Sequence, residues 1–385
     1  MIKRWLGASL LALSFSASWA MAQEAEVPDP IEPEELKVEP EIQPGPNVFV
    51  VSPAWGGAGA VTILSADDLS YKGNYATGMT AQFFLGPDAT VGYAASAFPE
   101  RITYGPVKAY LQKFDVSTLK TIEEVELPPI LAETMAQQPA LVISPDGKWA
   151  FAQNATPATS VTVVDLKTGT VASEIPNPGC WGIYLAPKGL KFSSLCGDGS
   201  VLTVKLNSKG KLADQAYSDP IFDVDGDPLF VHSQRIDGNL VFSTFDGEFV
   251  VVSDEGKTAK VLDSWSYTDG IEGDWAPGGY EIMAYSEPNG VMFVTMHSGA
   301  SEGSHKDGSE ELWAIDMKAK KVLYRSYAEH MTHVAVTGDA EAPVLFGVDG
   351  HEGTVYRYEI DPTARFAAKF TGSMHIQDAG YIVVK

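Results

Sequence analysis

A weak internal repeat constrains the fold of this chain more than any other feature of the sequence. The repeated unit is a short apolar strand, a turn, a strand that ends in Asp or Asn, a turn rich in Lys, Gly, Thr and Ser, and another strand. The clearest copy contains ISPDGKWAFAQN (143–154) followed by SVTVVDLKTGTVASEI (160–175). Seven copies can be aligned on one turn residue each, namely Asp68, Asp115, Asp165, Asn207, Asp254, Asp316 and Asp361.

The spacing of these turn residues is typical of β-propeller blades. Consecutive turn residues are 42 to 62 positions apart, and periods of roughly 40–50 residues built from short strands indicate blades of about four strands each. No window has a sustained helical period, and only residues 131–139 could form one helical turn, within a loop. We therefore predict an all-β fold, a seven-bladed β-propeller over residues 47–385. Its first strand, 47–52, and its last strand, 380–385, are expected to close the ring in one blade.

The N-terminal segment is typical of an exported protein. Residues 1–22 contain two cations, an uncharged stretch and the small-x-small sequence Ala20-Met21-Ala22, which together predict a cleaved secretory signal peptide. A retained membrane anchor is the alternative, but the stretch is shorter than the ~20 apolar residues of a span and contains serines. We expect a periplasmic protein with no membrane attachment.

Residues 23–46 form a second N-terminal segment with a different composition. They include eight acidic residues, one lysine and six prolines, and no aromatic residue. Such a segment cannot bury enough apolar surface to offset the entropy that is lost on ordering, so we predict an extended, mobile, acidic tail. The tail could be a solvated leader, or it could reach over a neighbouring subunit.

Charge and missing motifs limit the classes of function. Fifty Asp and Glu residues against 27 Lys and Arg give a net charge of −23, which argues against nucleic acid or an anionic membrane as a partner because both attract cationic residues. The sequence contains no HExxH, CxxC or P-loop, and no GxGxxG after a strand. We therefore predict no catalytic residue, no cofactor-binding residue and no metal site in this chain, as expected for a platform protein.

Cys180 and Cys196 are the only cysteines. In an exported chain, two cysteines predict a disulfide bond. The turn sequence Pro187-Lys188-Gly189 between them would bring two adjacent strands together. A redox-active pair is the alternative, but it usually needs CxxC-like proximity and a lowered thiol pKa.

The sequence from Asp223 to Asp227 looks like the beginning of a calcium loop. However, Gln234 occupies the twelfth position, where an EF-hand has a bidentate Glu, and Pro228 occupies the position of the loop glycine. We favour an acidic turn, with a weak cation site as the alternative.

Two rim segments could contact a partner. Residues 296–311 read as a long polar hairpin loop, and loops of this size are usually functional. Residues 265–280 contain two Trp and two Tyr, which could either pack within the fold or form a partner surface.

Several short sequences are more specific than generic propeller strands. They are PGCWGIY (178–184), LCGDGSV (195–201) and DWAPGGY (274–280), in the same order as NVFVVSPAW (47–55) and SHKDGSEELWAID (304–316). Together they resemble the heavy chain of the quinoprotein amine dehydrogenases, the methylamine and aromatic amine dehydrogenases. The resemblance extends over essentially the whole exported chain.

This resemblance implies a function that the residues alone do not reveal. In that family the heavy chain is a seven-bladed propeller without its own cofactor, paired with a small, disulfide-rich light chain in an α₂β₂ heterotetramer. The light chain carries tryptophan tryptophylquinone and the catalytic base. The complex oxidatively deaminates a primary amine to an aldehyde and ammonia, and electrons pass to a periplasmic cupredoxin. The resemblance thus implies a subunit of an amine dehydrogenase, an oxidoreductase, that is inactive on its own.

Only three residues carry over from the family. The heavy-chain cysteines correspond to Cys180 and Cys196, which implies the same disulfide, and the wall of the substrate channel corresponds to SPAWGG (52–57), which makes Trp55 a candidate channel residue. One alternative is a stand-alone periplasmic binding propeller without a quinone partner. Another is a lactonase-type propeller hydrolase with its own metal, held by Asp223, Asp225 or rim histidines.

Overall fold

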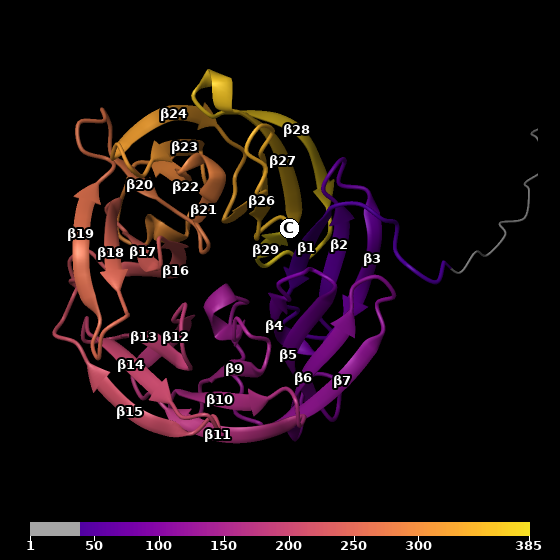
Figure 1. Cartoon of the computed structure of the whole chain (residues 1–385). Helices are drawn as coiled ribbons and strands as arrows, with labels where there is room; N and C mark the ends of the chain where they lie inside the picture. Colours follow the sequence, from indigo (N-terminus) through magenta and orange to yellow (C-terminus); the bar gives the residue numbers. More distant parts are fainter. Residues whose placement is uncertain (1–38) are drawn as a thin grey trace, which may run out of the picture. The chain divides into compact units, whose positions relative to one another are not determined.

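The computed structural model describes residues 39–385, and residues 40–385 form a ring of seven antiparallel sheets (Figure 1). Six sheets have four strands and one has five, which confirms the prediction of an all-β, seven-bladed β-propeller. The predicted signal peptide, and the predicted tail up to residue 38, lie outside the described residues. Within residues 39–385 we find no helix with the length and apolar character needed to cross a membrane.

Each blade is a meander whose first strand lines the centre of the ring and whose last strand lies on the rim (Figure 1). From the centre outward, blade 1 consists of β29 (Ile382–Val384), β1 (Asn47–Ser52), β2 (Ala60–Ser65) and β3 (Tyr71–Ala76), and blade 2 of β4 (Met79–Leu85), β5 (Val91–Pro99), β6 (Val107–Asp115) and β7 (Thr121–Leu127). Blade 3 consists of β8 (Leu141–Ile143), β9 (Trp149–Asn154), β10 (Ser160–Asp165) and β11 (Thr170–Pro176). Blade 4 consists of β12 (Cys180–Leu185), β13 (Lys191–Cys196), β14 (Val201–Leu206) and β15 (Leu212–Tyr217).

The remaining three blades follow the same plan. Blade 5 consists of β16 (Leu229–Ile236), β17 (Asn239–Thr244), β18 (Glu248–Ser253) and β19 (Lys260–Ser266). In blade 6, β20 (Trp275–Pro277) and β21 (Met283–Ser286) both pair with β22 (Val291–Ser298), which is followed by β23 (Glu311–Asp316) and β24 (Lys321–Tyr327). Blade 7 consists of β25 (His333–Val336), β26 (Val344–Asp349), β27 (Thr354–Asp361) and β28 (Ala367–His375). Four single 3₁₀ turns interrupt the described chain, namely η1 (Gln138–Ala140), η2 (Glu287–Asn289), η3 (Ser304–Lys306) and η4 (Pro362–Ala364). Of the segment 131–139, in which one helical turn was predicted, only Gln138 and Pro139 belong to a 3₁₀ turn, η1.

The turn residues that define the sequence repeat shape the hairpins between the third and fourth strands. In six blades the side-chain oxygen of this residue accepts a backbone N–H two or three positions later, as Asp165 does from Lys167 (2.9 Å). Blade 5 is the exception, because the buried Asp254 carboxylate instead pairs with the Arg235 guanidinium at 3.0 and 3.1 Å.

The last strand closes the ring, as predicted. Strand β29 pairs antiparallel with β1, with Val383 opposite Phe49. Just before β29, the buried Tyr381 hydroxyl accepts the backbone N–H of Phe83 (2.7 Å) and donates to the carbonyl of the same residue. The closing strand is therefore bonded to blade 2 as well as to blade 1.

Strand direction assigns every loop to one of two faces. Because each blade is antiparallel, the connections into the inner strands share one face with the loops between second and third strands. We call this the start face, since the inner strands begin there, and the opposite one the end face.

Before β1, Ile42 donates its N–H to the Ser117 carbonyl (2.8 Å) and packs beside Leu119, so this part of the predicted tail (23–46) contacts blade 2.

Tyr381→Phe is expected to destabilise the ring. The substitution removes the hydroxyl and leaves the buried N–H and carbonyl of Phe83 unpaired, which costs about 1–3 kcal/mol. Urea unfolding monitored by circular dichroism measures the change, and Tyr71→Phe on the exposed face of β3 is the matched control. Equal midpoints for the two variants would contradict this role of the hydroxyl.

Candidate functional site

Trp55 lies in the loop between β1 and β2, on the start face. Its side chain is 59% exposed, and a side chain added at the neighbouring Gly56 or Gly57 would meet no other atom within 4 Å of its Cβ. The base of the loop is fixed, because the N–H of Thr80 donates to the Pro53 carbonyl (2.6 Å). The structure thus presents the predicted channel residue on a fixed loop, with its indole facing solvent.

A second exposed apolar loop lies on the same face of the adjacent blade. Between β5 and β6, Ile102 is 77% exposed and Tyr104 is 64% exposed. Ile102 has φ of +68°, a left-handed conformation that is rare for a β-branched residue and costs on the order of 1–3 kcal/mol. The Arg101 guanidinium lies 5.4 Å from the ring centre of Tyr104. Sequence reasoning missed this loop, although its run of Ile and Tyr between polar turn residues was a usable signal.

A disulfide bond joins Cys180 and Cys196, the pair expected from the sequence. The two residues are direct cross-strand partners at the start-face ends of β12 and β13, with Cα atoms 3.9 Å apart. Next to the bond, the N–H of Gly197 donates to the Gly179 carbonyl (3.0 Å). The disulfide therefore ties the connection into blade 4 to that blade's own start-face loop.

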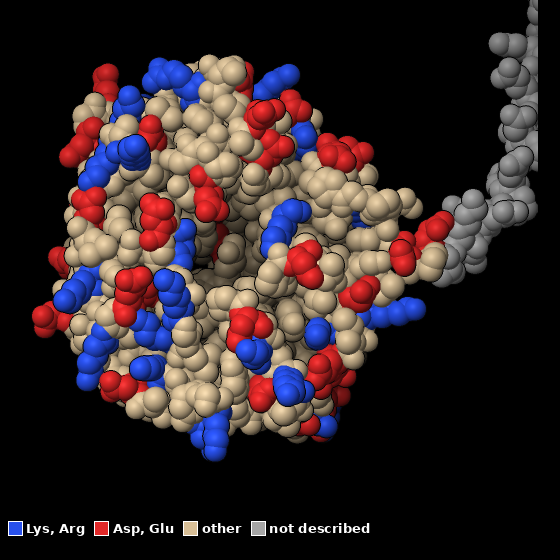
Figure 2. Space-filling model, in the orientation of Figure 1, with Lys and Arg blue, Asp and Glu red and all other residues tan. Residues whose placement is uncertain are grey.

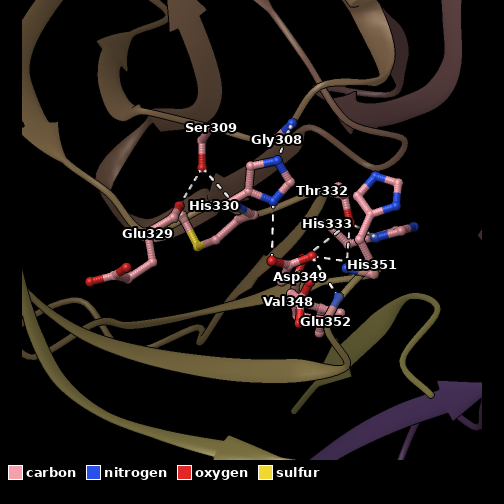
Figure 3. A network of polar contacts seen from close by, with 12 residues as sticks. Gly308, Ser309, Glu329, His330, Thr332, His333, Val348, Asp349, His351 and Glu352 are labelled. Atoms are coloured by element: carbon pink, nitrogen blue, oxygen red, sulfur yellow. Dashed lines mark hydrogen bonds and ion pairs between the residues drawn. The ribbon is translucent and has the colours of Figure 1, made fainter. Parts of the chain in front are cut away.

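The long loop between β22 and β23, predicted at 296–311, is anchored to blade 7 (Figure 3). The N–H of Gly308 donates to Nε2 of His330 (3.0 Å), and Nδ1 of His330 lies 3.2 Å from the Asp349 carboxylate. Ser309 donates its hydroxyl to the Glu329 carbonyl at 2.8 Å. A side chain at position 308 would lie about 2.5 Å from the His330 ring, so this contact requires glycine.

The aromatic residues of 265–280 mostly pack within the fold. Tyr267 is buried and its hydroxyl lies 2.7 Å from that of Ser243. Trp275 packs at a tilt against Trp313, with ring centres 5.8 Å apart, and the Arg325 guanidinium lies 4.4 Å from the centre of the Trp275 ring. Of the two interpretations that the sequence left open, packing describes these residues.

The acidic turn at 223–227 is shaped by its own backbone. The Asp223 carboxylate accepts the N–H groups of Asp225 and Gly226, both at 3.0 Å, and these bonds lower the pKa of Asp223. Burial raises the pKa of Asp227. Residues 39–385 contain no group of three His, Cys, Asp or Glu side chains that could hold a metal ion.

A polar plug occupies the centre of the ring. The connection from β7 to β8 turns inward, and its turn η1 lies inside the ring in Figure 1. Gln137 donates its N–H to Gln82 Oε1 (2.9 Å) and accepts the indole N–H of Trp181 (3.1 Å). Gln138 donates its N–H and its side-chain amide to the two oxygens of Glu281, at 2.7 and 2.8 Å. The plug therefore links blades 2, 3, 4 and 6.

Burial controls the ionisation of the groups around the plug. Burial raises the pKa of Glu281 to about 8 even though both hydrogen bonds from Gln138 lower it. Burial also lowers the pKa of His232 and of His333 to about 3, so both rings are neutral at neutral pH. Figure 2 shows a hollow at the centre of the ring, with cationic and acidic side chains interspersed around it.

Comparison with known proteins gives consistent sequence matches. The sequence profile described as "Methylamine dehydrogenase heavy chain" matches residues 46–369. The chain is 26% identical over 320 residues to the methylamine dehydrogenase heavy chain of Methylorubrum extorquens, a match that covers 81% of this chain and 77% of that protein. It is 24% identical over 287 residues to the heavy chain of Methylobacillus flagellatus, covering 73% and 71% of the two chains.

Solved structures with a similar fold are more distant in sequence. A functionally unknown protein from Desulfotomaculum acetoxidans has a TM-score of 0.61 at 13% identity, over 88% of this chain and 98% of that one. A dihydro-heme d1 dehydrogenase has a TM-score of 0.55 at 15% identity, over 92% and 77% of the chains. These similarities show the propeller fold alone.

Glu281→Gln is expected to change how stability depends on pH. The carboxyl has a pKa of about 8 when folded against 4.5 as a free side chain, so between these values the folded state binds more protons and the wild-type protein loses stability as pH rises. The variant has no carboxyl at this position, so it does not lose stability in this way as pH rises. Gln138 can rotate its amide to form a hydrogen bond with the new side chain. Its stability relative to wild type should therefore increase between pH 5 and pH 8, by an amount on the order of a few kcal/mol.

Urea unfolding of Glu281→Gln and of wild type, at pH 5 and at pH 8, measures this difference in stability. The contributions of the buried histidines cancel, because both proteins contain them. Glu133→Gln, an exposed residue of the same connection, is the control and should follow the wild-type pH dependence. A pH-independent difference between Glu281→Gln and wild type would contradict the assignment.

Proposed function

The chain belongs to the methylamine dehydrogenase heavy chain family, and from this premise we propose that it is the non-catalytic heavy subunit of a periplasmic quinoprotein amine dehydrogenase. The observation that carries the proposal is the family match over residues 46–369, which includes nearly the whole propeller. Family membership supports an oxidoreductase subunit of the amine dehydrogenase type. The location, the assembly and the substrate channel are the parts that we propose.

The partner is a small, disulfide-rich light chain, two copies of which join two copies of this chain. The start face suits its docking, because exposed aromatic and aliphatic side chains on fixed loops are the usual centre of a protein interface. Trp55, Ile102 and Tyr104 supply such side chains on blades 1 and 2. The anchored loop at 299–310 and the disulfide at Cys180 and Cys196 keep the rest of the face in place.

The two chains contribute different parts of the proposed activity. The family's cofactor, tryptophan tryptophylquinone, belongs to the light chain and supplies the redox chemistry, by which a primary amine becomes an aldehyde and ammonia while electrons leave to a periplasmic cupredoxin. This chain shapes the substrate channel. Once covered by the light chain, the Trp55 indole would form one wall of the substrate channel, limit the width of the amine that enters and exclude water.

A stand-alone binding propeller is the second candidate function. It would use the same start face for a different partner and would need no quinone-bearing chain. The two candidates differ in what accompanies the protein in the cell.

Purification of the tagged chain from its native periplasm tests the proposal. We expect a small co-eluting chain with a visible absorption band that an added primary amine bleaches. A colourless single chain of the mass of this protein would overturn the proposal and favour the stand-alone propeller.

Trp55→Ala is expected to widen the substrate specificity of the assembled enzyme. Removing the indole opens the channel wall, so kcat/KM for benzylamine should rise relative to that for methylamine by roughly 10-fold, the size of a single pocket contact. Steady-state assays on the co-purified complex measure the ratio. Tyr71→Ala on β3, an equally exposed aromatic residue outside the start face, should leave it unchanged, and an unchanged ratio for Trp55→Ala would exclude the residue from the channel.

A further inference from the structure

The loop between β22 and β23 (299–310) depends on one titratable side chain for part of its anchorage. Backbone hydrogen bonds to other segments fix the loop at His305 and again at Ser309. Between these two points, a single hydrogen bond joins the loop to another segment of residues 39–385, from the N–H of Gly308 to Nε2 of His330 (3.0 Å). The three residues between His305 and Ser309 therefore rely on His330 for their attachment.

The two neighbours of His330 determine where its ring carries a proton (Figure 3). A backbone N–H can only donate, so Nε2, which faces Gly308, is an acceptor and carries no hydrogen. Nδ1 lies 3.2 Å from a carboxylate oxygen of Asp349, and an ionised carboxylate can only accept, so Nδ1 carries the hydrogen. In this geometry the ring is neutral, and both of its nitrogens are engaged.

Asp349 would pair more strongly with a charged ring. Its side chain is 5% exposed and forms no ion pair with a Lys or Arg of residues 39–385. Its Oδ1 accepts the backbone N–H groups of His351 (2.8 Å) and Glu352 (3.1 Å), and its Oδ2 faces Nδ1 of His330. Because a buried charge without a counter-charge is costly, protonation of His330 would stabilise this carboxylate.

The contact with Gly308 opposes that protonation. A proton on Nε2 would place two N–H groups against each other, and the hydrogen bond to Gly308 would be lost. A Cβ at position 308 would lie about 2.5 Å from the His330 ring, so Gly308 has to move away when Nε2 gains a proton. The other titratable or charged groups on the segments around His330 are Lys306, Asp307, Glu329, His333, His351, Glu352 and Tyr356. The carboxylates among them favour the charged ring, whereas Lys306 opposes it.

From this conflict we propose that His330 is a pH-sensitive anchor, whose neutral ring holds Gly308 to blade 7 and whose protonated ring pairs with Asp349 and releases residues 306–308. Histidine side chains ordinarily change charge between pH 5 and pH 8, which sets the range of the release. The hydrogen bonds of Ser309 do not titrate there, so the rest of the loop stays attached. The start face is therefore less fixed in acid. Any effect on the docking of a light chain rests on the proposed function, whereas the anchor uses this chain alone.

Hydrogen exchange on the full-length exported chain, expressed alone, tests the anchor. Mass spectrometry with fragmentation follows the Gly308 amide from pH 5 to pH 8, and each rate is divided by that of an unstructured peptide at the same pH. We expect protection to fall roughly 10-fold from pH 8 to pH 5, the size of one lost hydrogen bond, in a single-proton transition. The start-face loop at 197–200, which contains no histidine, is the internal reference. Equal protection of Gly308 at both pH values would overturn the proposal.

Two variants assign the transition to His330. His330→Gln offers an uncharged oxygen to the Gly308 N–H, so protection should no longer depend on pH. Asp349→Asn keeps an oxygen for the two backbone N–H groups but removes the charge that stabilises the protonated ring, so the midpoint should fall by about one pH unit.

His351→Gln is the matched control, because His351 is exposed and its ring centre lies 5.8 Å from that of His330. This variant should keep the wild-type midpoint. A transition that persists in His330→Gln, an unmoved midpoint in Asp349→Asn, or a transition that is lost in His351→Gln would contradict the assignment.

Discussion

The pairing of the last strand with the first is the constraint on which the rest of this structure depends. Six blades are continuous in sequence, but blade 1 is assembled from β29 and from β1 to β3, so without it the chain would be an open array with unpaired edges at both ends. Tyr381 extends the closure to blade 2 through both backbone groups of Phe83. The plug, the cavity of about 260 Å³ beside it and a start face with fixed loop positions all require a closed ring.

Closure leaves a central channel, and polar side chains fill part of it. Gln138 belongs to the connection into blade 3, and Glu281 lies between β20 and β21 of blade 6, across the ring. Two hydrogen bonds join the two residues. A buried carboxyl without a cationic partner is a poor source of stability. We therefore attribute to this pair the placement of the plug, which Gln137 and Gln138 together bond to blades 2, 4 and 6.

The plug separates two regions with different chemistry. On the start face, exposed apolar side chains stand on anchored loops, which suits contact with another protein chain. Toward the end face, an open cavity of about 260 Å³ lies beside the plug and is lined mainly by residues of the inner strands. A propeller accommodates both because its loops and its channel are built from different parts of each blade, so that changes in one leave the other intact.

The sequence by itself determined the features that arise from local chemistry. The repeat spacing predicted seven blades, the turn acids predicted the hairpins and the two cysteines predicted their pairing, since strand alternation, Asx turns and a short disulfide loop depend on neighbouring residues. Tertiary structure alone decided that Asp254 binds Arg235 instead of capping its turn, and that Glu281 meets a glutamine 143 positions away. The contact between Gln138 and Glu281 arises when ring closure brings blades 3 and 6 together, and the contact between Arg235 and Asp254 arises when the sheet of blade 5 forms. No local pattern records either geometry.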